Sequence, residues 1–349
     1  MMRGEKKIII GVVIVLALMP AILAFKTQAT LFKISVDDRG FLPKIDEKLL
    51  PNLPRIDNRK LPRVLPIQKD PFSGFSWPKP EPNRVDILLL GIRGIDDPYG
   101  GALTDAILIA SLKKDTGRLA LISIPRDLYV PIPGTKRYTK INEAYAWGRK
   151  AGGEKGGLSL AKKTLEFVTG VHIDYVARID FTAFKEAIDA VGGIEIFLDK
   201  PFKEESQWPG EGGFFLPAGK NVLDGKTALY YVRSRFSTSD FDRAQRLQQV
   251  LLAFKDKALS LGVLANPQKI LELLAIAGEH IRTDMKPSEI TQYLALVPSL
   301  DFSQVKRKVF DTTASGHLVS AHLGSEYILW PKDGNWQVLR KDCQGIFED

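Results

Sequence analysis

Three clusters of charged residues in this chain have the residue types and spacing that phosphate chemistry requires. The first lies in a Gly-rich loop between two apolar runs, residues 91–105, and carries Asp96, Asp97 and Asp105. Loops at strand ends are common ligand sites in open α/β sheets. Carboxylates are also the hard oxygen ligands that Mg²⁺ prefers when it holds a diphosphate. The loop therefore indicates a metal-assisted diphosphate site, or else a surface connection with solvated acids.

The second cluster follows an apolar run, in the sequence Ser-Ile-Pro-Arg-Asp that ends in Arg126 and Asp127. Pro125 cannot donate a hydrogen bond to a sheet, so it directs the following residues away from it. A guanidinium binds two phosphate oxygens at once, and a neighbouring carboxylate can orient it or accept a proton. The alternative is an ordinary arginine–aspartate pair at the surface.

The third cluster holds four arginines within a short stretch: Arg233, Arg235, Arg243 and Arg246. Arg243 and Arg246 are three residues apart, so they share one face of the helix expected there. If the loop before that helix folds back, all four guanidiniums can converge on one anion. A nucleic-acid-binding patch and a solvated basic surface are the alternatives.

Overall composition narrows the classes of partner. The net charge of +8 favours anionic partners, but it does not choose among nucleic acid, anionic lipid, a phosphorylated substrate and an acidic polymer. Cys343 is the only cysteine, which excludes an internal disulfide and a multi-cysteine metal site. The four histidines lack the spacing of a metal site on one helix face.

The N-terminal sequence predicts a membrane anchor. An uncharged run, residues 8–25, follows Arg3, Lys6 and Lys7, and it is long enough to cross a bilayer as a single helix. The basic flank is expected to stay in the cytoplasm, which places the rest of the chain outside the membrane. A cleaved signal peptide and a buried core helix are alternatives, and the lack of a clean small-residue cleavage site argues against the first.

Composition and periodicity divide the rest of the chain. The predicted parts are a cytoplasmic start (1–7), a transmembrane helix (8–25), a Pro-rich extracytoplasmic spacer (26–82), a catalytic domain (83–260) and a C-terminal extension that packs on the same domain (261–349). The spacer includes Phe72–Trp77, which is apolar enough to dock on the folded domain.

Strands and helices are expected to alternate along the folded region. Short apolar runs predict strands near residues 85–92, 106–112, 119–124, 175–179, 194–198 and 305–310. Helical spacing predicts helices near residues 158–168, 181–191, 225–231, 243–261, 267–280 and 287–296. Asp180 is the expected N-cap of the second of these helices. This order indicates an α/β fold with a central mixed sheet flanked by helices.

These segments, in this order, resemble the LytR-CpsA-Psr family over roughly residues 84–260, with a weaker tail to about 330. The resemblance is carried by short motifs: Asp86-Ile-Leu-Leu-Leu-Gly91, Leu103-Thr-Asp105, Leu121-Ile-Ser-Ile-Pro-Arg-Asp127, Lys140-Ile-Asn142-Glu-Ala-Tyr145, Val191-Gly-Gly-Ile194, Leu223-Asp-Gly225, Tyr231-Val-Arg-Ser-Arg235 and Asp242-Arg-Ala-Gln-Arg246. The resemblance implies one membrane helix and an extracytoplasmic domain whose apolar pocket holds a polyprenyl chain. At the pocket mouth, arginines and Mg²⁺ are expected to hold the pyrophosphate of the lipid.

The resemblance also implies roles for individual residues. Asp105 matches a metal-side aspartate, and Asp127 matches an orienting residue or a base. The residues that match pyrophosphate ligands are Arg126, Arg233, Arg235 and Arg243, with Arg246 close and Lys140 as a further basic residue. Arg93 stands where the family usually has an aspartate, so Asp96, Asp97 or neither is the second metal-side carboxylate.

The implied activity is transfer of a phosphate-linked glycopolymer from a polyprenyl-pyrophosphate carrier to a peptidoglycan hydroxyl, which releases polyprenyl phosphate. Two alternatives remain, namely a non-catalytic protein that binds polyprenyl phosphate or wall polymer, and a transcriptional attenuator. The predicted topology opposes the attenuator and any nucleic-acid partner, because a domain outside the membrane cannot meet the chromosome.

Overall fold

The computed structural model describes residues 30–37, 41–46, 71–98, 101–208, 211–235, 237–260, 267–296 and 300–348. The predicted cytoplasmic start and transmembrane helix lie outside these ranges, as does much of the predicted spacer. Among the residues in these ranges, no helix combines the length and the apolar character that crossing a bilayer requires.

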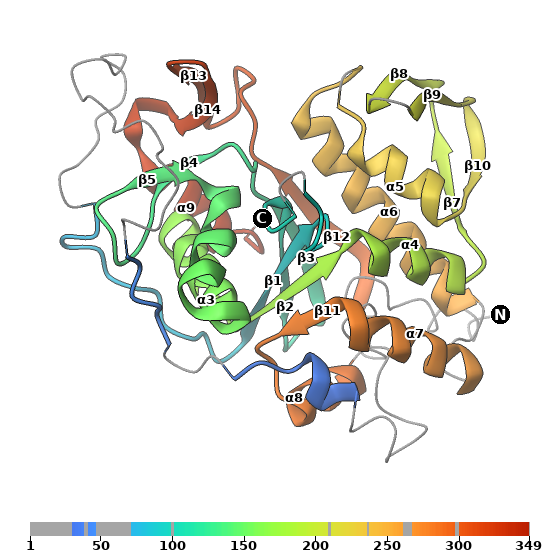
Figure 1. Ribbon diagram of the computed structural model, residues 1–349, viewed down its shortest axis with the longest axis horizontal. Coiled ribbons are helices and arrows are strands. Elements are labelled where there is room, and N and C mark those ends of the chain that lie inside the picture. Colours follow the sequence, from blue (N-terminus) through green and yellow to red (C-terminus); the bar gives the residue numbers. More distant parts are fainter. Residues whose placement is uncertain are drawn as a thin grey trace. The chain divides into compact units, whose positions relative to one another are not determined.

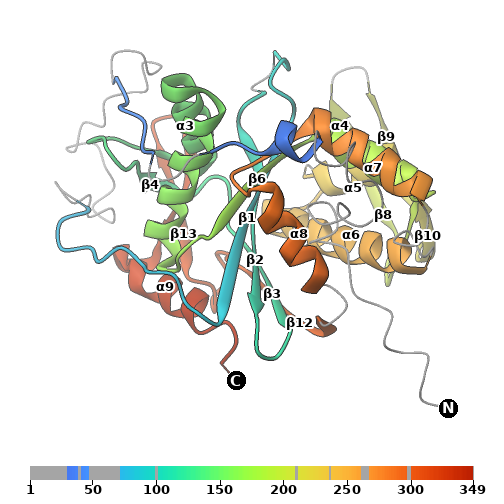
Figure 2. The same ribbon diagram turned by 90° about the horizontal axis from the view of Figure 1, so that it is seen from below.

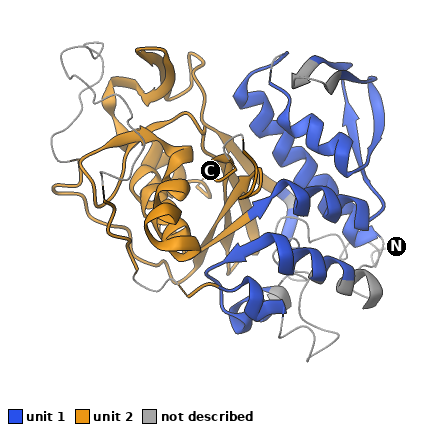
Figure 3. Cartoon of the chain, in the orientation of Figure 1, with its two compact units in different colours: residues 1–35, 179–304 blue, residues 36–178, 305–349 orange. Residues whose placement is uncertain are grey.

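The chain forms two compact units, each assembled from two separate stretches (Figure 3). Unit 1 consists of residues 1–35 and 179–304, and unit 2 of residues 36–178 and 305–349. The predicted boundaries at residues 83 and 261 follow changes in sequence character and remain predictions. Both units combine helices and strands, so each is described separately below.

A buried sheet forms the centre of unit 2, and β2 (Thr104–Lys113) is one of its inner strands. β2 pairs antiparallel with β1 (Arg84–Ile92) on one side and with β3 (Arg118–Ser123) on the other. β6 (Tyr175–Asp180) borders β1, and β12 (Asp301–Val309) borders β3 (Figure 1). The predicted α/β fold with a central sheet flanked by helices is confirmed, because the Leu- and Ile-rich strands are buried on both faces.

Two helices of unit 2 pack against each other on one side of this sheet (Figure 2). α3 (Ala144–Thr169) is longer than the helix predicted over residues 158–168, and α9 (Trp336–Gln344) was not predicted. α3 is broken at Gly152 and Gly153, whose backbone angles are not helical.

Small hairpins complete unit 2. β4 (Tyr129–Pro131) pairs with β5 (Tyr138–Lys140), and a short 3-10 helix, η2 (Ile141–Glu143), follows. β13 (Leu318–Leu323) pairs with β14 (Glu326–Pro331). The single-turn helix η5 spans Lys332–Gly334. The two hairpins meet near the second charged cluster, since the Leu329 backbone N–H donates to the Asp127 carbonyl over 2.9 Å.

The apolar end of the predicted spacer docks on unit 2. The Phe72 and Phe75 rings lie 4.9 and 5.0 Å from the Phe167 ring on α3, both in edge contacts. The Arg340 guanidinium of α9 lies 4.5 Å from the centre of the Phe75 ring. The predicted docking of Phe72–Trp77 is therefore confirmed.

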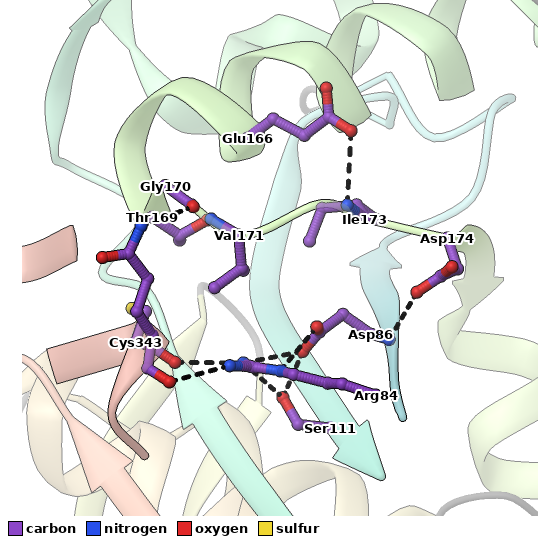
Figure 4. A network of polar contacts seen from close by, with 11 residues as sticks. Arg84, Asp86, Ser111, Glu166, Thr169, Gly170, Val171, Ile173, Asp174 and Cys343 are labelled. Atoms are coloured by element: carbon purple, nitrogen blue, oxygen red, sulfur yellow. Dashed lines mark hydrogen bonds and ion pairs between the residues drawn. The ribbon is translucent and has the colours of Figure 1, made fainter. Parts of the chain in front are cut away.

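A buried polar network joins the start of β1 to α9 (Figure 4). Arg84 pairs with Asp86 over 2.7 Å and donates to the backbone carbonyls of Cys343 and Gln344, at 3.0 and 3.1 Å. Ser111 on β2 donates to the same Asp86 carboxylate. The last turn of α9 is thus held by a side chain of the central sheet.

Unit 1 consists mainly of helices, together with two antiparallel strand pairs. Its helices are α4 (Phe181–Ala190), α5 (Gly225–Arg233), α6 (Asp240–Ser260), α7 (Pro267–His280) and α8 (Pro287–Leu296). β7 (Ile194–Leu198) pairs with β10 (Gly219–Leu223), and β8 (Phe202–Trp208) forms a hairpin with β9 (Glu211–Leu216). β11 spans Ile281–Thr283. Asp180 caps α4 as predicted, because its carboxylate accepts from the Ala183 N–H over 2.9 Å.

Candidate anion-binding site

The antiparallel pairing of β1, β2 and β3 brings three loop ends to one edge of the sheet in unit 2. Ile92 at the end of β1 pairs with Thr104 at the start of β2. The Ile124 N–H, just after β3, donates to the Ile107 carbonyl over 3.0 Å. Arg93 and Asp105 come one residue after Ile92 and Thr104, and Arg126 comes two residues after Ile124, so all three are neighbours at this edge.

Charged side chains alternate along this edge in a continuous run. The Arg93 Nε lies 3.7 Å from Asp105 Oδ2, and Arg126 Nη1 donates to Asp105 Oδ1 at 2.5 Å. Arg126 Nε lies 3.6 Å from Asp127 Oδ2, and Lys140 Nζ lies 3.0 Å from Asp127 Oδ1. We call these five residues the charged run; it contains three cations and two carboxylates.

Backbone hydrogen bonds fix Lys140 beside Asp127. Lys140 is the last residue of β5 and pairs with Tyr129 on β4. The Ile141 N–H donates to the Leu128 carbonyl over 2.7 Å, and the Asn142 N–H donates to the Arg126 carbonyl over 3.3 Å. The segment that carries Lys140 is thus tied to the loop that carries Arg126 and Asp127.

The charged run is largely shielded from solvent, with side-chain exposures between 14% and 21%. Burying charge is unfavourable unless each group is paired, and here every carboxylate oxygen faces a cation. The run nevertheless keeps an excess of one positive charge. Such a site is suited to an anion that brings several negative oxygens, such as a diphosphate.

The predicted metal ligands do not form a cluster around Asp105. Asp96 is exposed in a turn closed by hydrogen bonds from Gly94 N to Gly101 O (3.4 Å) and from Asp97 N to Gly94 O (2.9 Å). Within the part of the chain that the structure describes, no three His, Cys, Asp or Glu residues are arranged to hold a metal ion. Both oxygens of Asp105 face guanidiniums. As they are arranged, these residues do not fit a divalent cation. The Mg²⁺ that the family resemblance implies stays a prediction.

The four arginines of the third cluster all belong to unit 1. Arg233 is the last residue of α5, and its guanidinium lies 4.8 Å from the centre of the Phe181 ring. Arg243 lies on α6, with its Nη2 3.6 Å from Asp240 Oδ2. Arg235 lies in the loop between these helices, and its Nε is buried.

Arg246 differs from the others because its guanidinium binds the loop itself. Its Nε donates to the Tyr231 carbonyl over 2.9 Å, its Nη1 donates to Thr238 Oγ1 over 3.0 Å, and its Nη2 donates to the Ser234 carbonyl. The residue is only 6% exposed, and burial lowers the pKa of its guanidinium. These contacts position the arginine loop; the predicted contact of Arg246 with pyrophosphate remains a prediction.

The sequence assigned no role to one member of the charged run, Arg93, and noted it only as a departure from a pattern. A usable signal was available, because Arg93 directly follows a predicted buried strand and therefore shares the strand edge with Asp105. Asn142 was quoted only within a motif. Its Oδ1 is buried and has no hydrogen-bond partner among the described residues, and the Thr104 hydroxyl donates to its backbone carbonyl over 3.2 Å.

The described site is thus a charged run of three cations and two carboxylates at one edge of a buried sheet, an arrangement whose chemistry suits an anion. The chain belongs to the LytR_cpsA_psr family, whose model matches residues 67–327. The structure of Bacillus subtilis TagV has a similar fold, with a TM-score of 0.58 and 26% sequence identity over 77% of this chain and 98% of that chain. The expected resemblance to this family is therefore confirmed.

Two relatives have names that describe a reaction. A polyisoprenyl-teichoic acid–peptidoglycan teichoic acid transferase TagU from Oceanobacillus iheyensis is 33% identical over 61% of this chain and 63% of that relative. A TagU of the same description from Enterococcus faecalis is 30% identical over 72% of this chain and 74% of that relative. The matched region thus spans less than two thirds of the first relative and about three quarters of the second.

Proposed function

We propose that this protein is a phosphotransferase that moves a glycopolymer from a polyprenyl-pyrophosphate carrier to a peptidoglycan hydroxyl. The observation that carries the proposal is the charged run at one sheet edge, in a member of a family with relatives named as teichoic acid transferases. We further propose that the chain is anchored by residues 8–25 and acts outside the cell membrane, because the basic residues precede the apolar run.

The proposed reaction exchanges one phosphorus–oxygen bond for another. The acceptor hydroxyl oxygen attacks the phosphorus nearest the glycan, and the bond from that phosphorus to the bridging oxygen breaks. The hydroxyl proton passes to the departing polyprenyl phosphate, directly or through water. The glycan is left on the acceptor through a phosphodiester, and polyprenyl phosphate departs with the bridging oxygen. Negative charge spreads over the phosphoryl oxygens in the transition state, so positioning and cations supply most of the catalysis.

The residues of the charged run divide into cations that bind and carboxylates that orient. Arg126 and Lys140 are the proposed ligands of the phosphoryl oxygens, since a fixed guanidinium and an ammonium offset the developing charge. Asp105 and Asp127 hold them, because each carboxylate contacts two cations of the run. An orienting role for Asp127 is therefore favoured over that of a base.

Arg233, Arg235 and Arg243, which belong to unit 1, are proposed as pyrophosphate ligands because they match the motifs of the family. Arg246 supports this assignment indirectly, since it ties the end of α5 to α6 through Tyr231 and Ser234. A loop held at both ends presents its arginines with little loss of conformational entropy on binding.

The test measures release of polyprenyl phosphate from a synthetic polyprenyl-pyrophosphate glycan by the full chain in detergent micelles, with peptidoglycan as the acceptor. Arg126→Ala is expected to lower turnover roughly 100-fold or more, since the loss of one charge-stabilising donor typically costs about 3 kcal/mol. Arg307→Ala, which removes an exposed arginine on β12, is the matched control and should leave turnover unchanged. Equal turnover in both variants would reject the assignment of Arg126.

A second candidate function is non-catalytic binding of polyprenyl-linked glycan. It is favoured by the lack of an acidic cluster around Asp105 among the described residues. Tight binding of the lipid-linked glycan, together with no release of polyprenyl phosphate in the presence of a wall acceptor, would select this candidate over the transferase.

A further inference from the structure

Asp105 is held between two guanidiniums that arrive from different strands. Arg126 follows β3 and reaches one carboxylate oxygen, while Arg93 follows β1 and faces the other. The two arginine side chains are 15% exposed and that of Asp105 is 19% exposed. The carboxylate is therefore enclosed by cations, and neither of its oxygens is left without a positively charged neighbour.

The strand geometry holds Arg93 in this place. Gly91 faces Ala106 across the β1–β2 pair so closely that a Cβ at Gly91 would lie 2.9 Å from the Ala106 Cβ. The pairing register then shifts between Gly91 and Ile92, so that Ile92 pairs with Thr104. Arg93 is the next residue along, and it emerges beside Asp105 rather than further along the loop.

The loop beyond Arg93 closes on itself. A Cβ at Gly101 would lie 2.0 Å from the Gly94 carbonyl oxygen, so only glycine permits this approach. The turn keeps Asp96 exposed. Among the described residues, Asp105 forms ion pairs with two guanidiniums and is not part of a cluster of three or more metal-ligating side chains.

Charge decides which ligand this arrangement accepts. A divalent cation normally needs carboxylate oxygens together with phosphate oxygens and water. Beside Asp105 it would displace one guanidinium and remain within a few ångströms of the other, where like charges repel strongly. A diphosphate is instead attracted by both guanidiniums, and each planar fork can donate two parallel hydrogen bonds to its oxygens.

We propose that Arg93 takes the place beside Asp105 that a divalent cation would need, so that Arg93 and Arg126 bind the diphosphate without metal. This inference rests on the proposed diphosphate chemistry and names a further ligand of that site. Arg93 is then a binding residue, and Asp105 positions the two guanidiniums rather than a metal ion.

The first experiment titrates inorganic diphosphate into the full chain in detergent micelles that contain EDTA, followed by calorimetry. The wild type is expected to bind, Arg93→Ala to bind at least tenfold more weakly, and Arg93→Lys to fall between them because it keeps the charge without the fork. Arg307→Ala is the control for loss of one positive charge and should match the wild type. No binding in EDTA, or equal affinity of Arg93→Ala and the wild type, would overturn the proposal.

The second experiment follows Mn²⁺ by electron paramagnetic resonance, which reports a bound ion without any need for turnover. In the presence of diphosphate, the wild type and Arg93→Ala should give the same Mn²⁺ spectrum, without a protein-bound ion. Arg93→Asp should bind an ion, and the additional change Asp105→Asn should abolish that binding. Stoichiometric Mn²⁺ on the wild type would overturn the proposal. Metal-free diphosphate binding without glycan transfer would instead reject the proposed function and leave the role of Arg93 intact.

Discussion

Arginines in this chain serve two different purposes, and their contacts distinguish them. Arg126 contacts carboxylates at a strand edge, where phosphoryl oxygens can compete for its remaining donors. Arg246 donates to two backbone carbonyls and a hydroxyl within its own unit, so each of its three guanidinium nitrogens already has an acceptor from the fold. Sequence spacing alone placed both in one class, because a guanidinium looks the same whether its acceptors come from the fold or from a ligand.

Replacement of Arg246 by alanine is expected to destabilise unit 1 by about 3 kcal/mol, since hydrogen bonds to a charged group contribute roughly 1.5–3 kcal/mol and buried acceptors would be left unpaired. Urea unfolding of the full chain measures this free energy. Arg243→Ala is the matched control on the same helix and should cost less than about 1 kcal/mol, because it loses one i,i+3 pair. Equal destabilisation by both changes would contradict a positioning role that is specific to Arg246.

Glu143, directly after the Lys140 segment, gives a pH-dependent prediction. Burial raises the pKa of Glu143 above its usual value, although Trp147 Nε1 donates to its carboxylate over 3.0 Å. A carboxyl with a raised pKa in the fold favours its protonated form there. Its contribution to stability is therefore present below the pKa of the unfolded chain and is lost as the pH rises through the folded pKa.

Glu143→Gln is consequently expected to raise the thermal midpoint at pH 7 and to change it little at pH 4, where the wild-type carboxyl is largely protonated. Thermal unfolding at the two pH values measures the difference. Glu81→Gln, at an exposed position of the same unit, is the control and should show no such pH dependence. A lower midpoint for Glu143→Gln at pH 7 would contradict the assignment.

Among the helices and strands, the strands predicted from apolar runs agree best with the structure. The predicted strands at residues 85–92, 106–112 and 119–124 correspond to β1, β2 and β3. Because these strands are antiparallel neighbours, they bring together Asp105, Arg126 and Asp127, which the sequence had identified separately. The pairing partners themselves were not predictable, since long-range register leaves no local signal in fully buried strands.

α3 shows why a helix can be missed. Its first half is rich in glycine, which lowers intrinsic helix propensity by about 1 kcal/mol per residue relative to alanine. Packing overrides that propensity: a Cβ at Gly148 would lie 2.2 Å from the Gly156 carbonyl, so the two halves approach through bare backbone. The sequence therefore predicted only residues 158–168 of a helix that spans Ala144–Thr169.

The missed hairpins and the last helix share a different cause. β13, β14 and α9 are short, and they are ordered by contacts with residues far away in sequence. Leu329 pairs with Leu128, and Arg340 of α9 donates to the Phe167 carbonyl over 3.0 Å. Asp96 and Asp97 remained undecided for a related reason, because the approach of Gly94 to Gly101 that shapes their turn has no signature in spacing.

Unit 2 is assembled from two stretches that lie far apart in the sequence. Unit 2 contains residues 36–178 and also residues 305–349, so it can be completed only after the last part of the chain has been made. The C-terminal extension predicted to pack on the same domain contributes β13, β14 and α9 to the unit that holds the charged run. The part of the extension from residue 305 onward thus belongs to the framework that supports the site, although its sequence has no recognisable catalytic motif.

Deletion of residues 332–349 is expected to abolish cooperative unfolding of unit 2. α9 and the residues after it bury Leu339, Cys343 and Phe347, and full burial of a large apolar side chain contributes about 2 kcal/mol. The deletion also removes the carbonyls that accept from Arg84, which is only 5% exposed, and a buried charge without its partners costs several kcal/mol. Together these losses approach the roughly 5–15 kcal/mol by which domains are stable.

Thermal unfolding and limited proteolysis of the full chain and the deletion variant measure the effect, with Lys341→Ala as the control at an exposed position of α9. A sharp transition and protease resistance of residues 71–178 in the deletion variant would show that unit 2 does not depend on its C-terminal helix.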